Sequence, residues 1–82
     1  MFDDSYTGKR REIGARIKKR RLEIGLTQQE LAEALGHGSS HRINQIELGR
    51  LRLYAEELPK LCWTLDCLVS DIVPGEPAKG IK

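Results

Sequence analysis

Residues 25–49 read GLTQQELAEALGHGSSHRINQIELG and predict two short helices joined by a tight turn. Thr27 and Glu30 form a capping box at the start of the first helix, because each side chain can bond the backbone N–H of the other residue. Leu31 begins the apolar stripe that this helix buries. Gly36 ends the helix, because glycine readily adopts the left-handed backbone found there.

The second of these helices is predicted to begin at Ser39 as its N-cap and to run to about Leu48, with Gly49 as its C-cap. Ile43 and Ile46 are three residues apart and face the core. The opposite face is polar, and its side chains can bond the edges of DNA bases: Ser40, His41, Asn44 and Gln45. Two short helices with a polar outer face on the second form a helix-turn-helix, which places that second helix in the major groove.

Basic residues concentrate in one part of the chain. The 82 residues carry a formal net charge of +2. Residues 9–52 contain eleven basic and five acidic residues, a net charge of +6, whereas residues 1–8 and residues 53–82 each carry −2. This asymmetry favours a polyanionic partner such as DNA, and an ordinary solvated surface is the alternative.

Three further helices are predicted, at about residues 10–24, 55–65 and 69–73. Glu56 and Glu57 lie in the first turn of the fourth helix, where negative charge complements the helix dipole. The fold class is therefore all-α with five helices. The chain divides into a flexible N-terminal arm, a helix-turn-helix domain and a flexible C-terminal tail, at residues 1–8, 9–73 and 74–82.

These residues resemble the Cro and lambda-repressor-like, Xre-type, family of helix-turn-helix proteins. The resemblance covers about residues 13–73 and is carried mainly by residues 25–32, GLTQQELA, and residues 43–49, INQIELG. It implies a five-helix lambda-repressor-like DNA-binding domain. It also implies a transcriptional regulator, in the leading interpretation a repressor, that binds a near-palindromic stretch of double-stranded DNA as a homodimer.

The resemblance also implies roles for individual positions. Ser40, His41, Asn44 and Gln45 match the base-contacting face of the recognition helix. Arg21 on the first helix matches an arginine that forms a structural ion pair with Glu47. Contacts to DNA phosphates are predicted for a wider set: Gln28, Gln29, Ser39, Arg42, Arg50 and Lys18.

The sequence departs from the family pattern at three places. One residue more than the common spacing lies between Gly36 and Glu47, and we place it in the turn at residues 37–38. The assignment of the base-contacting residues can therefore shift by one position along the helix. Arg20 stands where an apolar residue is common, and Tyr54 stands where Ser or Thr usually caps the fourth helix.

Composition and spacing argue against several other classes. Cys62 and Cys67 are interpreted as small core residues, and a zinc site formed with His37 and His41 is the weaker alternative. We therefore predict no metal and no cofactor. The sequence shows no nucleophile–base pair and no glycine-rich phosphate loop, so we expect no enzymatic activity. Without an apolar run of membrane-spanning length or a secretory signal, a cytoplasmic protein with no membrane partner is expected.

Trp63 and Ile72 are candidate contacts in a dimer interface, because aromatic residues are enriched at interfaces and both residues lie in the acidic part of the chain. The alternative for Trp63 is packing against Tyr54, Ile72 or the tail. Ile72, together with Val73, is also predicted as a core residue that closes the last helix. A competing function is that of an antitoxin or adaptor, whose main role is to bind a partner protein and for which DNA binding is secondary.

Overall fold

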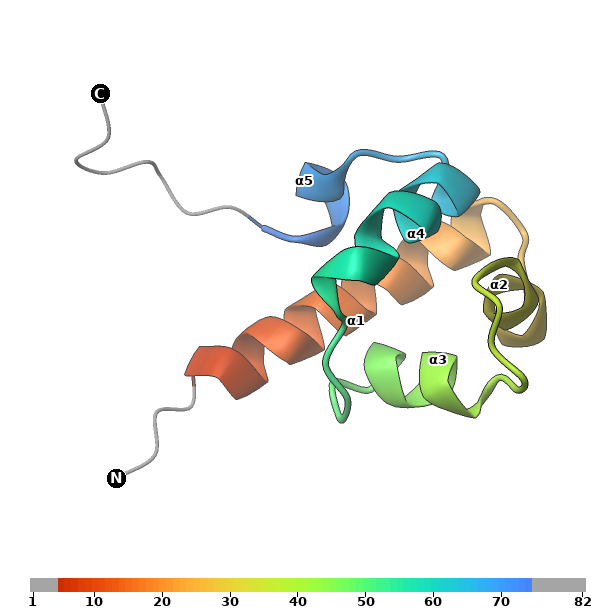
Figure 1. The fold of residues 1–82 in the computed structure, drawn as a ribbon. Coiled ribbons are helices and arrows are strands. Elements are labelled where there is room, and N and C mark those ends of the chain that lie inside the picture. The colour runs from red at the N-terminus through yellow and green to blue at the C-terminus, as the bar shows by residue number, and fades with distance from the viewer. Residues whose placement is uncertain (1–4, 75–82) are drawn as a thin grey trace.

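The computed structural model describes residues 5–74. The regular elements in this part of the chain are all helices, joined by turns and loops, with no strand (Figure 1). Its elements are α1 (Ser5–Glu23), α2 (Gln28–Ala34), α3 (His41–Glu47), the short 3₁₀ helix η1 (Ala55–Glu57), α4 (Leu58–Leu65) and α5 (Val69–Ile72). The predicted all-α fold with five α-helices is confirmed. No helix in the described range is long and apolar enough to cross a membrane.

The long helix α1 is the element around which the others pack. It contacts α3 and α5, while α2 lies against both α3 and α4. Figure 1 shows α3 on one side of α1 and the α4–α5 pair on the other. This arrangement leaves the outer face of α3 uncovered.

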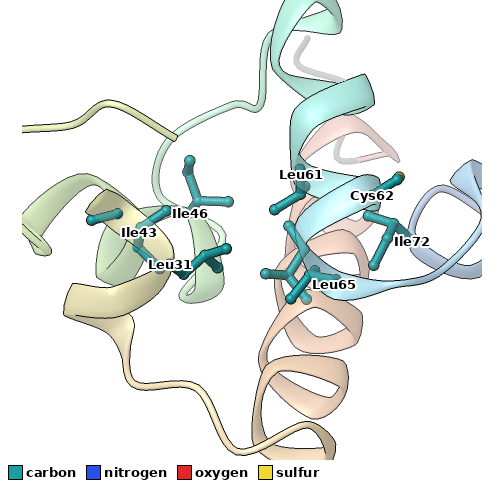
Figure 2. Close-up of a cluster of buried hydrophobic side chains, with 9 residues drawn as sticks. Leu31, Ile43, Ile46, Leu61, Cys62, Leu65 and Ile72 are labelled. Atoms are coloured by element: carbon teal, nitrogen blue, oxygen red, sulfur yellow. The ribbon is translucent and has the colours of Figure 1, made fainter. Parts of the chain in front are cut away.

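The core lies where these helices converge. Leu31, Ile43 and Ile46 come from α2 and α3, and their side chains point toward those of Leu61 and Leu65 on α4 (Figure 2). The complete set of buried apolar residues is Ile17, Leu31, Ala32, Ile43, Ile46, Leu61, Cys62, Leu65 and Ile72. The apolar positions predicted for the second and third helices therefore do form part of the core.

Gly14 allows the backbones of α1 and α3 to come into close contact. A methyl group at this position would meet the carbonyl oxygens of Ile46 and Glu47, and the Glu47 oxygen would be only 2.5 Å away. Real side chains do not tolerate this distance, so the residue type at Gly14 determines how closely the C-terminal end of α3 sits on α1.

The predicted start of the first helix and the predicted end of the N-terminal arm were both wrong. α1 begins at Ser5, about five residues earlier than predicted, so residues 5–8 of the predicted arm are helical. Gly8 costs a helix only about 1 kcal/mol relative to alanine, which does not stop a helix this long. Residues 1–4 of the predicted arm and residues 75–82 of the predicted tail lie outside the described residues.

The start of α3 also differs from the prediction. Ser40, rather than Ser39, is the N-cap residue, and its side chain makes no capping bond. The hydroxyl of Ser39 instead accepts a hydrogen bond from the His41 N–H at 3.4 Å. Ser40 already has right-handed helical dihedrals, φ −77° and ψ −5°, so the predicted and observed caps differ by a single residue at a gradual helix start.

The predicted fourth helix is divided into two elements. Residues 55–57 form the 3₁₀ turn η1, and the α-helix proper starts at Leu58. Pro59 lies in the first turn of α4, where its missing N–H would have had no partner within the helix.

Candidate nucleic-acid interface

The capping box at the start of α2 is formed as predicted. The Thr27 hydroxyl accepts from the Glu30 N–H at 3.0 Å, and the Glu30 carboxylate accepts from the Thr27 N–H at 2.8 Å. Two donors that would otherwise be unpaired at the helix start are thereby satisfied. The box fixes where α2 begins and therefore where Gln28 is placed.

The outer face of α3 carries the four residues predicted to read bases. Ile43, Ile46 and Glu47 are buried, so the opposite face of this short helix points to solvent. His41 is exposed, and the other three are partly exposed: Ser40, Asn44 and Gln45. The structure therefore brings these four together on one uncovered surface.

Gln28 links α2 to α3. Its Nε2 donates to Asn44 Oδ1 at 3.2 Å and to Glu47 Oε1 at 2.9 Å. An amide nitrogen has only two protons, and both are used here. The Nε2 group of Gln28 can therefore donate to a phosphate only if one of these bonds breaks. In the structure, the bond to Oδ1 orients the amide of Asn44.

The ion pair predicted between Arg21 and Glu47 is present. Arg21 Nε donates to Glu47 Oε2 at 2.6 Å and its Nη2 donates to Oε1 at 3.0 Å, while Nη1 donates to the Leu26 carbonyl at 2.8 Å. The two residues are 6% and 7% exposed, so the pair is almost fully buried. This bidentate pair joins α1 to the C-terminal end of α3.

A second Arg–Glu pair at the other end of α3 was missed by the sequence analysis. Glu57 on η1 accepts from Arg42 Nε at 3.2 Å and from Arg42 Nη2 at 2.7 Å. It also bonds His37 Nε2 at 3.2 Å and accepts from the Tyr54 N–H at 2.9 Å. We refer to His37, Arg42, Tyr54 and Glu57 as the Glu57 cluster.

The ionisation of this cluster reflects its contacts. Partial burial tends to raise the pKa of the Glu57 carboxyl, but the bonds from Arg42, the Tyr54 N–H and His37 outweigh burial, so this pKa lies below its ordinary value. The hydrogen bond to Glu57 raises the pKa of Arg42, against the opposing effect of burial. Both pKa shifts mean that the contacts favour the charged forms of Glu57 and Arg42.

The remaining predicted phosphate contacts lie at the edges of this face. Gln29, Ser39, Arg50 and Lys18 are exposed. Lys18 follows Gly14 by one helical turn, so it borders the side of α1 that packs on α3. The Gln29 amide donates to Glu33 at 3.2 Å, a bond on the surface.

Arg20 has a structural role that explains its presence at a position where an apolar residue is common. Its Nε donates to the Leu65 carbonyl at 2.8 Å and its Nη2 donates to the Asp66 carbonyl at 2.9 Å. Carbonyls at the end of a helix have no partner within the helix. Arg20 therefore caps α4 and is directed away from α3.

The structure corrects one of the two predicted dimer contacts. Ile72 is completely buried in the core, with 0% exposure, and cannot touch a partner subunit. Trp63 is 82% exposed, so packing against Tyr54 or Ile72 is also wrong. The other prediction for Ile72, a core residue that closes the last helix, is confirmed.

Cys62 and Cys67 are free thiols, the first buried and the second partly buried. Burial, together with the neighbouring Cys62, raises the pKa of the Cys67 thiol to about 11. Within the described range, no group of three or more His, Cys, Asp or Glu side chains is arranged to hold a metal ion.

The fold and this surface define a helix-turn-helix DNA-binding domain. Residues 17–67 match the helix-turn-helix family model. The chain belongs to the Xre-type helix-turn-helix family and is a DNA-binding transcriptional regulator that binds double-stranded DNA. No curated protein is significantly similar to the chain in sequence.

Several solved structures are similar to this chain. The clp gene regulator ClgR from Corynebacterium glutamicum is 33% identical with a TM-score of 0.72, over 78% of this chain and 81% of that one. The restriction-modification controller protein C.AhdI from Aeromonas hydrophila is 22% identical with a TM-score of 0.76, over 83% of this chain and 97% of that one. The DNA-binding domain of BldD is 19% identical with a TM-score of 0.72, over 83% and 97% respectively, and these last two support the fold.

Proposed function

We propose that this regulator is a homodimeric repressor that inserts α3 into the major groove of a near-palindromic operator. The observation that carries the proposal is the uncovered polar face of α3, formed by Ser40, His41, Asn44 and Gln45. Amide side chains such as Asn44 and Gln45 can pair with adenine in the major groove, whereas Ser and His can donate or accept. The inward face of the same helix is anchored in the core, so the outer face is presented rigidly.

Phosphate contacts would orient the domain on the duplex without adding sequence information. Arg50 lies just beyond Gly49 after the end of α3, and Lys18 borders α3 from α1, so we expect both to contact the DNA backbone beside the groove. Gln29 and Ser39 are exposed beside them. The net charge of +6 over residues 9–52 supports this electrostatic component.

Dimerisation through α4 is compatible with this mode of binding. Trp63 on α4 is 82% exposed, and Leu68 and Val69 at the start of α5 are also exposed. Figure 1 shows α4 and α5 on the side of α1 away from α3, so an interface there leaves both recognition helices free. A two-fold dimer would present them about 34 Å apart, one turn of DNA.

Selection of the purified chain against a random pool of duplex DNA, followed by sequencing, tests this function. Enrichment of a two-fold symmetric motif is the expected result. Gln45→Ala should then lose preference at one base pair of each half-site, at a cost of about 1–3 kcal/mol. Trp63→Ala, measured by sedimentation, should shift the dimer toward monomer.

A folded chain that enriches no sequence would contradict DNA readout. It would favour the alternative role of an antitoxin or adaptor, for which the exposed Trp63 is the natural contact with a partner protein. Enrichment of an asymmetric single site would retain sequence-specific binding and would contradict the homodimer.

A further inference from the structure

The two ends of the recognition helix are held by different means. At its C-terminal end, α3 lies against Gly14 on α1 and is joined to Arg21 through Glu47. At its N-terminal end the cap residue Ser40 makes no side-chain bond, and the contact from the His41 N–H to the Ser39 hydroxyl is long, at 3.4 Å. Capping alone therefore holds this end weakly, although in helix-turn-helix proteins it is the end that contacts base edges.

The carboxylate of Glu57 occupies that position. One of its oxygens, Oε1, accepts from Arg42 Nη2 and from the Tyr54 N–H, while Oε2 bonds Arg42 Nε and His37 Nε2. A carboxylate has about four lone-pair sites, and here four bonds use them. Glu57 therefore connects the turn, through His37, and the first turn of α3, through Arg42, to η1.

Arg42 is restrained on its other sides as well. Its guanidinium lies over the Tyr54 ring at 4.9 Å from the centroid, and Nη2 also donates to the Arg52 carbonyl at 3.3 Å. A planar guanidinium held by a carboxylate at its edge and an aromatic ring at its face has little freedom to rotate. In this conformation Arg42 is part of the support for α3 rather than a side chain extended toward phosphate.

We propose that Glu57 is a positioning residue for base selection. By holding Arg42 and His37 together it sets the rotation of α3 about its axis and the path of the turn, and so determines which base edges Ser40 and His41 meet. The inference rests on the proposed readout by α3 and adds a residue that does not itself touch DNA.

The test compares Glu57→Gln with Glu56→Gln. Both substitutions remove one negative charge from η1, but Glu56 is exposed and makes none of the bonds of the Glu57 cluster. Each variant is selected against the random duplex pool, and its affinity for the selected site and for an unrelated duplex is measured below the unfolding temperature of each variant. The ratio of these two affinities isolates base selection from non-specific attraction.

We expect Glu57→Gln to lower this ratio by about tenfold or to change the enriched bases read by Ser40 and His41, which is the loss typical of one misplaced base contact. Glu56→Gln should keep the wild-type ratio and motif. Arg42→Met provides a second variant, and the double variant Arg42→Met/Glu57→Gln should lose no more specificity than either single variant, because both act through the same connection.

An unchanged ratio and motif in both Glu57→Gln and Arg42→Met would overturn the inference. Additive losses in the double variant would also contradict it, because independent effects would not require the connection between Arg42 and Glu57. A wild-type chain that enriches no motif would instead remove the proposed function on which the inference rests. The two failures are therefore distinguishable.

Discussion

The two ends of α3 differ in how an arginine–glutamate pair is used. The Arg21–Glu47 pair at the C-terminal end is buried and bidentate, with 7% and 2% exposure of the side chains. The Arg42–Glu57 pair at the N-terminal end is more open, with 25% and 17% side-chain exposure, and shares its carboxylate with His37 and Tyr54. The first pair therefore belongs to the core of the domain, whereas the second lies at the border of the surface that we propose to face DNA.

This difference in burial determines what each pair contributes. A buried charge that loses its partner is stranded without solvent, so the cost of breaking the pair is large. A partly exposed pair is screened to some extent by water, so breaking it costs less stability and mainly allows the helix end to move. We therefore expect the C-terminal pair to control folding and the N-terminal pair to control the position of the recognition helix.

The largest effect is expected for Arg21→Met. Glu47 would keep only the bond from Gln28, and the free energy of unfolding should fall by about 3–5 kcal/mol. Urea unfolding followed by circular dichroism measures this loss. The double variant Arg21→Met/Glu47→Leu should recover much of it, because no charge is then buried; a double variant less stable than Arg21→Met would contradict the assignment.

Gly14→Ala should have the next largest effect. The added methyl group would press on the Ile46 and Glu47 carbonyls and force α1 away from α3, at a cost of about 1–3 kcal/mol. Gly8→Ala on the same helix is the matched control, since a methyl group there meets nothing within 4 Å. Thermal unfolding should show Gly8→Ala slightly above the wild type and Gly14→Ala well below it. Equal midpoints would show that the close contact is not required.

The two ends of α3 also differ in how far the sequence predicted them. Local signals were sufficient for the capping box at Thr27 and for the inward positions Ile43 and Ile46, because helical periodicity and capping depend on neighbours three or four residues away. The Arg21–Glu47 pair spans 26 residues, and only the resemblance to a family indicated it.

No comparable pattern indicated the Glu57 cluster. Arg42 and Glu57 are separated by 15 residues in the sequence, and His37 and Glu57 by 20. Only the path of the chain after α3 brings these residues into contact. Glu57 follows Tyr54 at the spacing of a capping box, which was the one local signal available. The same dependence on tertiary packing explains why the sequence left Ile72 open between a core position and a dimer contact.

Glu57→Gln should reduce stability less than either change at the other end of α3. The loss of this partly exposed charge pair predicts a fall of about 1–2 kcal/mol in the free energy of urea unfolding near neutral pH. Glu56→Gln, which removes the same charge, should remain within about 0.5 kcal/mol of the wild type. A loss as large as that of Arg21→Met would place the Glu57 cluster in the folding core and would erase the contrast between the two ends.

The smallest expected effect is a pH dependence of the difference in unfolding free energy between the wild type and Glu57→Gln. The pKa of Glu57 is lowered in the folded chain, so the unfolded chain binds more protons as the carboxyl titrates. The stability that its charge contributes is fully present above the unfolded pKa of about 4.3 and is lost as the pH falls through the lower folded value. The gap in unfolding free energy between wild type and Glu57→Gln should therefore narrow from about pH 5 toward about pH 3. The gap for Glu56→Gln should stay small throughout this range, and a Glu57→Gln gap that widens with acid would mean that the carboxylate is not held in its charged form by Arg42 and His37.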